Sequence, residues 1–163
     1  MIVVSDTSPI RALSFIEQLS ILEKLFGAVV IPPAVVDELA HPARLAIDDS
    51  PVMLAQFPLS EVRAPVDASR VDQLAQILDR GESEAIVLAE ELRCSAILVD
   101  EAAGRRIALR KGLVPLGSAG MLQRQKKVGF LREVRPLLDR LNDDLGFFIG
   151  HTPHRQILEL AGE

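Results

Sequence analysis

The 163-residue sequence has no tryptophan, no tyrosine and only six phenylalanines. A nucleic-acid-binding surface built from stacked aromatic side chains is therefore not expected. The single cysteine, Cys94, cannot form an internal disulfide, and it precedes an apolar segment, so we interpret it as a small buried hydrophobic residue. The sequence also lacks an apolar run of ~18 residues and a basic segment ahead of its first apolar run. These absences predict a cytoplasmic protein without a membrane span.

Several common enzyme signatures are missing as well. The sequence contains no Gly-x-Gly-x-x-Gly, no phosphate loop ending in Gly-Lys-Ser/Thr and no Gly-x-Ser-x-Gly. Its three histidines, His41, His151 and His154, do not have the spacing of a zinc site with Cys94. Nucleotide-dependent chemistry, hydrolysis by a nucleophilic serine and a structural zinc site are therefore disfavoured.

The net charge bears on how the protein could bind nucleic acid. The net charge is −5, which disfavours nucleic-acid binding by simple phosphate neutralisation. An acidic pocket that holds a divalent cation remains compatible with it, because a bound ion inverts the local sign of charge. Hydrophobic residues make up 48% of the chain and the mean hydropathy is +0.24, which indicates a folded protein with a well-filled core.

Short apolar segments alternate along the chain with segments of helical periodicity. This alternation predicts an α/β fold with a mainly parallel sheet covered by helices on both faces. We expect residues 1–145 to form one domain and residues 146–163 to form a C-terminal element packed on it. The strands are expected at 2–4, 29–31, 59–64, 96–99 and 113–116. The helices are expected at 10–26 with a break near Ser14 or Gln18, and at 34–39, 69–81, 83–92, 102–110, 117–127, 131–141 and 154–160. The loop-rich part is 41–58, with helical turns at 43–47 and 51–56.

Four acidic residues stand out by their position relative to these strands. Asp6 and Asp100 each end an apolar strand, Glu38 follows the second strand, and Glu84 lies in the first turn of a helix. The carboxyl ends of parallel strands lie on one edge of a sheet, so the four side chains are expected to converge there. Taken singly, each has an ordinary structural explanation, as a helix cap or as an acid near a helix N-terminus.

Carboxylates gathered without basic partners repel one another, and they favour a bound cation or a proton. Mg²⁺ and Mn²⁺ prefer such oxygen ligands. A divalent cation held in this way can activate water and stabilise a phosphoryl transition state. The residues themselves therefore predict metal-dependent hydrolysis of phosphodiester bonds.

Two basic runs accompany the acids. One follows Asp100 and the other lies near residue 125. Both are interpreted either as solvated helix faces or, if the acids hold a metal ion, as contacts to RNA phosphates. The first run comprises Arg105, Arg106, Arg110 and Lys111, and the second comprises Arg124, Lys126 and Lys127.

Four segments, taken in order, resemble the four motifs of PIN-domain nucleases. They read VVSDTSPIRAL, IPPAVVDELAHP, GESEAIVLAEEL and AILVDEAAGRRIALRKGLVPLGSAGMLQRQKKVG. The sequence is most similar to a prokaryotic subfamily of predicted nucleic-acid-binding PIN proteins related to VapC-type toxins. The likeness extends through LNDDLGFFI to the final LELAGE.

This resemblance implies a three-layer α/β/α fold and a Mg²⁺- or Mn²⁺-dependent endoribonuclease that cleaves single-stranded or structured RNA. It further implies a homodimer and the role of toxin in a toxin–antitoxin pair, neutralised by a small antitoxin protein. The catalytic and metal-binding residues that it implies are Asp6, Glu38, Glu84 and Asp100.

Two departures from the family pattern leave alternatives open. The fourth motif commonly reads Thr-x-Asp but here reads Val99-Asp100-Glu101, so the fourth ligand is either Asp100 or Glu101. The third acid is Glu84 where aspartate is common, and Glu82 could share its task. An inactive PIN-like module that binds nucleic acid or protein is the alternative function. A phosphoryl-accepting receiver domain is disfavoured, because the segment 114–116 lacks the lysine that such a domain needs after its last strand.

Overall fold

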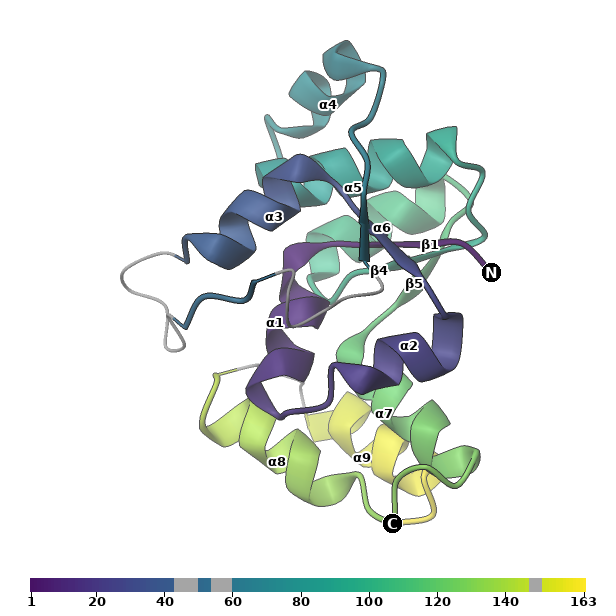
Figure 1. Ribbon diagram of the computed structural model, residues 1–163. Coiled ribbons are helices and arrows are strands. Elements are labelled where there is room, and N and C mark those ends of the chain that lie inside the picture. Colours follow the sequence, from purple (N-terminus) through teal and green to yellow (C-terminus); the bar gives the residue numbers. More distant parts are fainter. Residues whose placement is uncertain (43–49, 54–59, 147–150) are drawn as a thin grey trace.

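The central sheet has five parallel strands in the order β3-β2-β1-β4-β5 (Figure 1). The computed structural model describes residues 1–42, 50–53, 60–146 and 151–163. Val4 pairs with Val30 on one side and with Ile97 on the other, so β1 is the middle strand. All five strands were predicted, β2 with its observed bounds and the others within two residues at each end. The strands are β1 (Val3–Ser5), β2 (Val29–Ile31), β3 (Ser60–Val62), β4 (Ala96–Leu98) and β5 (Val114–Leu116).

Successive apolar residues of β1, β2 and β4 enter different hydrophobic clusters. Val3 and Leu98 belong to a larger cluster on one face of the sheet, whereas Val4 and Ile97 belong to a smaller cluster on the other face. Since side chains alternate between the two faces of a sheet, a strand buried on both sides is apolar on both. This explains why these three central strands lie in short apolar runs, whereas the edge strand β3 is partly polar.

Helices cover both faces of the sheet, which confirms the predicted three-layer α/β/α fold. In Figure 1, α5 and α6 lie on one face with α4 beyond them, and α1, α2 and α7 lie on the other face with α8 and α9 further out. No helix in the described part of the chain has the length and apolar character needed to cross a bilayer. The helices are α1 (Thr7–Phe15), α2 (Ser20–Phe26), α3 (Pro33–Ala40), α4 (Ala68–Leu74), α5 (Arg80–Glu91), α6 (Ala102–Arg110), α7 (Ser118–Lys127), α8 (Arg135–Asp143) and α9 (His151–Leu160).

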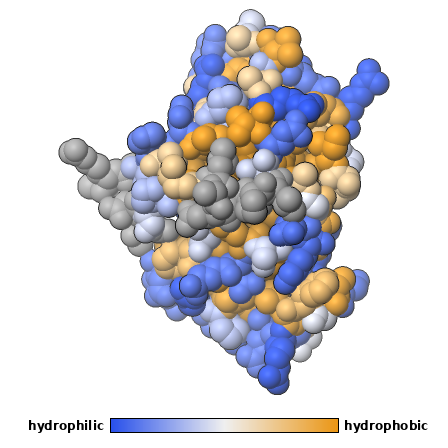
Figure 2. Space-filling model, in the orientation of Figure 1, coloured by the Kyte–Doolittle hydropathy of each residue, from blue (hydrophilic) through white to orange (hydrophobic). Residues whose placement is uncertain are grey.

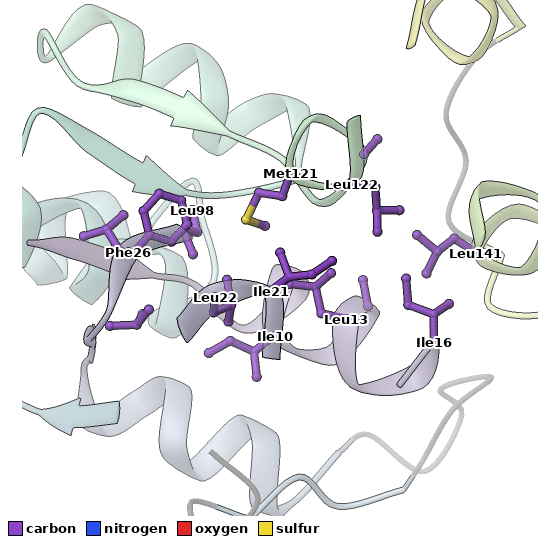
Figure 3. Packing of buried hydrophobic residues seen from close by; sticks show 14 of the residues in the cluster. Ile10, Leu13, Ile16, Ile21, Leu22, Phe26, Leu98, Met121, Leu122 and Leu141 are labelled. Carbon is purple, nitrogen blue, oxygen red and sulfur yellow. The ribbon is translucent and has the colours of Figure 1, made fainter. Parts of the chain in front are cut away.

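The larger cluster joins the first helices to α7 and α8. Figure 3 shows Ile10 and Leu22 near Leu98 of the sheet, and Met121 and Leu141 approaching from the later helices. Each fully buried side chain of this size stabilises the fold by about 1.5–3 kcal/mol through the removal of apolar surface from water. The packing therefore fixes α1 and α7, whose N-termini lie at the carboxyl ends of the strands.

Several predicted helices differ in their bounds, since α8 begins at Arg135 rather than Leu131, but the largest departure lies between residues 69 and 81. A single helix from Ser69 closed by Gly81 was expected, but α4 ends at Leu74 and α5 begins at Arg80, so that Gly81 lies in its first turn. The carboxylate of Asp79 accepts a hydrogen bond of 2.8 Å from the backbone N–H of Glu82, which caps the N-terminus of α5. This cap brings Asp79 and Glu82 to the carboxyl edge of the sheet.

Other expectations concern the less regular segments. The predicted break in the first helical region is confirmed, because residues 16–19 separate α1 from α2. The helical turns expected at 43–47 and 51–56 lie wholly or partly outside the described residues, as does the apolar segment 147–149. Figure 2 shows hydrophobic side chains reaching the surface between hydrophilic ones, and the homodimer stays a prediction.

The C-terminal element packs on the rest of the chain. Leu158 of α9 is buried in the larger cluster. The Glu163 carboxylate accepts hydrogen bonds from the Lys126 ammonium at 2.6 Å and from the backbone N–H groups of Val134 at 2.7 Å and Arg135 at 3.0 Å. These bonds join α7, the start of α8 and the end of α9. The division of the chain at residue 145 stays a prediction.

We predict that Glu163→Gln destabilises the protein by about 1–2 kcal/mol, because it weakens hydrogen bonds to a charged acceptor. Burial raises the pKa of Glu163, but the bonds from Lys126, Val134 and Arg135 outweigh it and lower this pKa to about 2. The contribution is therefore full above pH 4.5 and is lost as the pH falls through about 2. Thermal unfolding at several pH values measures it. The control is Glu159→Gln on the exposed face of α9, and an equal loss in both variants would contradict the prediction.

Candidate metal centre

The strand order places a crevice at the carboxyl ends of β1 and β4. The chain proceeds from β1 to β2 and β3 on one side of the sheet, then returns to β4 and β5 on the other. Ligands of open α/β sheets bind where the strand order reverses in this way. Asp6 directly follows β1, and its backbone N–H donates to the carbonyl oxygen of Leu98 at 3.0 Å. The position of Asp6 is thus fixed by both central strands.

Asp6, Glu38 and Asp79 form the first group of carboxylates. One oxygen of each lies within 4.8 Å of the others. Asp6 is 1% exposed, and its Oδ1 has no hydrogen-bond partner among the described residues. Glu38 accepts a hydrogen bond of 2.8 Å from the backbone N–H of Gly81 and another from the hydroxyl of Thr7. The first group therefore combines an oriented carboxylate with a buried one that lacks a partner.

Asp79, Glu82 and Glu101 form the second group, again with one oxygen of each within 4.8 Å of the others. Glu82 is 2% exposed, and within the described ranges its Oε1 has no hydrogen-bond partner. Glu101 is exposed, and the hydroxyl of Ser8 donates to it at 3.4 Å. Because Asp79 belongs to both groups, the five carboxylates form one continuous cluster, which we call the acid cluster.

Two glycines make room for the acid cluster. A Cβ atom added at Gly81 would overlap the carboxylate of Glu38, and one added at Gly104 would overlap that of Glu82. Gly81 lies in α5 and Gly104 in α6. The two helices thus approach the carboxylates so closely that a side chain at either position would displace a carboxylate of the acid cluster.

No member of the acid cluster forms a salt bridge with another described residue. Burial raises the pKa of Asp6 well above its usual range, and burial likewise raises the pKa of Glu38. Burial also raises the pKa of Glu82 to about 7, with a further contribution from Asp79. A divalent cation would offset both the repulsion between the carboxylates and the cost of burying them. It would also bind the buried oxygens that have no partner among the described residues. The donor set, which is entirely carboxylate oxygen, fits a hard cation such as Mg²⁺ or Mn²⁺.

The structure places the four acids predicted from the sequence in three different settings. Asp6 and Glu38 lie together in the first group. Glu84 instead accepts hydrogen bonds from the backbone N–H of Ala34 at 3.0 Å and from Nε of Arg80 at 3.2 Å. It therefore holds the start of α3, and it belongs to neither group.

Asp100 also lies outside both groups. Its carboxylate accepts hydrogen bonds from the backbone N–H of Ser118 at 2.7 Å and from the Ser118 hydroxyl at 2.6 Å. Burial raises the pKa of Asp100 to about 6, although these two bonds lower it. Asp100 therefore ties the end of β4 to the N-terminus of α7. The assignment of Glu84 and Asp100 as metal ligands stays a prediction.

Asp79 was missed by the sequence reasoning, whereas Glu82 and Glu101 were held as alternatives. A signal for Asp79 is present in Asp79-Arg80-Gly81-Glu82. An N-cap residue followed three positions later by glutamate is typical of a helix start. Read in this way, the pattern would have begun α5 at Arg80 and placed Asp79 among the residues at the strand ends.

The raised pKa of Glu82 predicts an unusual dependence of stability on pH when no cation is present. Between pH 4.5 and about 7 the folded protein binds more protons at Glu82 than the unfolded chain does, so the free energy of unfolding falls as the pH rises. Glu82 alone contributes a loss of about 3 kcal/mol, which is complete above pH 7. Thermal unfolding in EDTA should show this fall, and Glu82→Gln should reduce it.

A cation that binds the folded state should reverse the loss by mass action. We therefore expect Mg²⁺ or Mn²⁺ to raise the melting temperature more at pH 8 than at pH 5, where the buried carboxyls hold protons. Equal shifts at the two pH values, or a shift that persists in Asp79→Asn, would argue against cation binding by the acid cluster.

Comparison with known proteins identifies the family of the chain. A family model described as a PIN domain matches residues 2–163. A search of curated proteins found no match. The resemblance inferred from the four motifs is confirmed at the level of the family, while the relation to VapC-type toxins stays a prediction. Since the match spans almost the entire sequence, the chain belongs to the PIN-domain family.

Proposed function

We propose that the protein is a metal-dependent endoribonuclease that hydrolyses phosphodiester bonds of RNA. The observation that carries the proposal is the acid cluster, in which Asp79 links two groups of carboxylates and two buried oxygens have no partner in the described part of the chain. PIN domains are generally nucleases, and hydrolysis of phosphodiester bonds is the chemistry that such a cluster suits. The preference for RNA over DNA rests on the resemblance to the prokaryotic subfamily.

Each carboxylate has a defined place in this mechanism. Asp6, Glu38 and Asp79 would hold one cation, and Asp79, Glu82 and Glu101 a second. When bound, the cations activate water and neutralise the charge that develops on the phosphoryl group. In the reaction the water oxygen forms a bond to phosphorus, the bond from phosphorus to the leaving ribose oxygen breaks, and that oxygen takes up a proton.

The surrounding residues hold the carboxylates in place before substrate binds. Thr7 and the backbone of Gly81 fix Glu38, and the Asp79 side chain is held against the first turn of α5. Fixed ligands lower the cost of reorganisation during the reaction. A small antitoxin and a second copy of the chain remain proposed partners on the strength of the resemblance alone.

The first test is cleavage of a labelled, unstructured RNA in Mg²⁺, Mn²⁺ or EDTA. We expect cleavage that requires the metal, and a loss on the order of 100-fold or more in Asp6→Asn and Asp79→Asn, since even outer-shell changes at metal sites cost 10–100-fold. Glu133→Gln, which removes an exposed carboxylate elsewhere, is the matched control. If folded wild-type protein binds RNA but cuts none with either metal ion, the inactive binding module is the correct alternative.

A second test separates neighbouring acids. We predict that Glu82→Gln and Glu101→Gln abolish cleavage, because both carboxylates lie in the second group. Glu84→Gln and Asp100→Asn should reduce the melting temperature more than the cleavage rate, because these side chains hold helix N-termini. The reverse pattern would restore Glu84 and Asp100 as the ligands, as the sequence predicted. Measured metal affinities of the four variants provide a readout that is independent of activity.

A further inference from the structure

A groove of about 910 Å³ adjoins the acid cluster. Ser8 and Glu101 line it, and Glu101 belongs to the second carboxylate group, so the groove reaches the candidate metal centre. Gln123 and Arg124 of α7 and Ile157 of α9 line it as well. At 1.5 Å per residue, Arg124 lies about 9 Å along the axis of α7 from Ser118, the residue that Asp100 holds.

The groove receives one arginine from each of the two basic runs of the sequence. Arg105 of the first run and Arg124 of the second line it. Arg105 donates a hydrogen bond of 3.1 Å to the carbonyl oxygen of Val99 and is thereby held in the wall, whereas Arg124 is exposed. Two other members of the runs are engaged elsewhere, Lys111 with Glu90 at 3.7 Å and Lys126 with Glu163 at 2.6 Å.

The acidic residues that line the groove do not neutralise the charges of both arginines. Glu101 belongs to the acid cluster, and Asp100 is hydrogen-bonded to Ser118 and faced by Arg105. This leaves Arg124 as the groove cation without a carboxylate partner among the described residues. An anionic ligand that starts at the metal centre would therefore meet a positive charge as it runs along α7.

We propose that this groove binds the unpaired nucleotide next to the scissile phosphate, with Arg124 contacting the neighbouring phosphate. The proposal rests on the proposed function and names its substrate as a single strand. A volume of about 910 Å³ is within the range of sites for small ligands, about 300–1,000 Å³, and it is too small for a base-paired helix. The groove includes aliphatic side chains such as Leu116 and Ile157, which can pack against a base or ribose without aromatic stacking.

Gly120 provides a test of occupancy that leaves the fold intact. This residue of α7 lines the groove, and a Cβ atom added to it would meet no other atom within 4 Å. A side chain at this position therefore starts in open space at the groove. Gly120→Phe fills the groove, and Gly120→Ala is the matched control that adds only a methyl group.

The experiment measures binding of a labelled, unstructured RNA by fluorescence anisotropy. It uses the full chain in an Asp6→Asn background with Mg²⁺, so that RNA is not cut. We expect Arg124→Gln to weaken binding about tenfold, the effect of one charge-assisted hydrogen bond, and to reduce the salt dependence by the equivalent of about one phosphate contact. Lys127→Gln, which removes an exposed charge of α7 outside the groove, should change the affinity less than about twofold.

The two Gly120 variants test whether RNA occupies the groove. Gly120→Phe is expected to weaken binding about tenfold or more, and Gly120→Ala to weaken it much less, with circular dichroism showing both to be folded. Duplex RNA of the same sequence should bind more weakly than the single strand. Equal losses in Arg124→Gln and Lys127→Gln, wild-type binding by Gly120→Phe, or equal binding of duplex and single strand would each overturn the proposal.

Cleavage assays in the otherwise wild-type chain separate this proposal from the nuclease itself. If the groove variants cut RNA at the wild-type rate at subsaturating substrate, the nuclease stands and the groove is overturned. If RNA binding depends on Arg124 and Gly120 but no RNA is cut in Mg²⁺ or Mn²⁺, the groove is supported and the nuclease is overturned. Absence of RNA binding by the folded protein overturns both.

Discussion

The mutual repulsion of carboxylates in a partly buried space is the constraint on which the rest of this structure depends. Asp6 and Glu82 are almost fully buried, and each has an oxygen without a hydrogen-bond partner among the described residues. Such an arrangement lowers the stability of the fold unless a cation or protons occupy it. Gly81 and Gly104 increase the crowding of the carboxylates, because they let two helices approach them closely. The protein retains a locally unfavourable cluster, and its packing elsewhere must offset that cost.

The offsetting packing is the sheet with its two hydrophobic clusters. The central strands that end at the acid cluster are apolar apart from Ser5, because both of their faces are covered. The backbone N–H of Asp6 donates to the carbonyl oxygen of Leu98 in the neighbouring strand, so a displacement of the Asp6 backbone would disrupt the ladder between β1 and β4. Burial therefore does two things at once, because it raises the pKa of Asp6 and holds the residue in place.

The sequence predicted the layers of the fold but not which face of α5 meets the site. Hydrophobic periodicity located every strand, since each is short and bounded by residues typical of turns. It failed between residues 74 and 81, because Leu74 and Leu78 keep helical spacing across a real break and both contribute to the smaller cluster. Glu82 and Glu84 lie two residues apart on one helix and so point in different directions, about 200° apart. In the structure Glu84 faces α3, where it accepts a hydrogen bond from Ala34, and Glu82 faces Asp79.

A similar choice between neighbouring acids arises for Asp100 and Glu101 at the end of β4, where the position of α7 determines which of the two it binds. The N-terminus of α7 offers the Ser118 N–H and hydroxyl to Asp100, and a carboxylate at a helix N-terminus is stabilised by the unpaired N–H groups there. Once Asp100 is used in this way, Glu101 is the residue within reach of Asp79 and Glu82. The two neighbouring acids therefore have different partners. Glu101 belongs to the acid cluster, and Asp100 binds the N-terminus of α7. Asp100 sets α7 beside the acid cluster, and α7 in turn carries the wall of the adjoining groove. Asp100 thus shapes the proposed groove from a position outside both carboxylate groups.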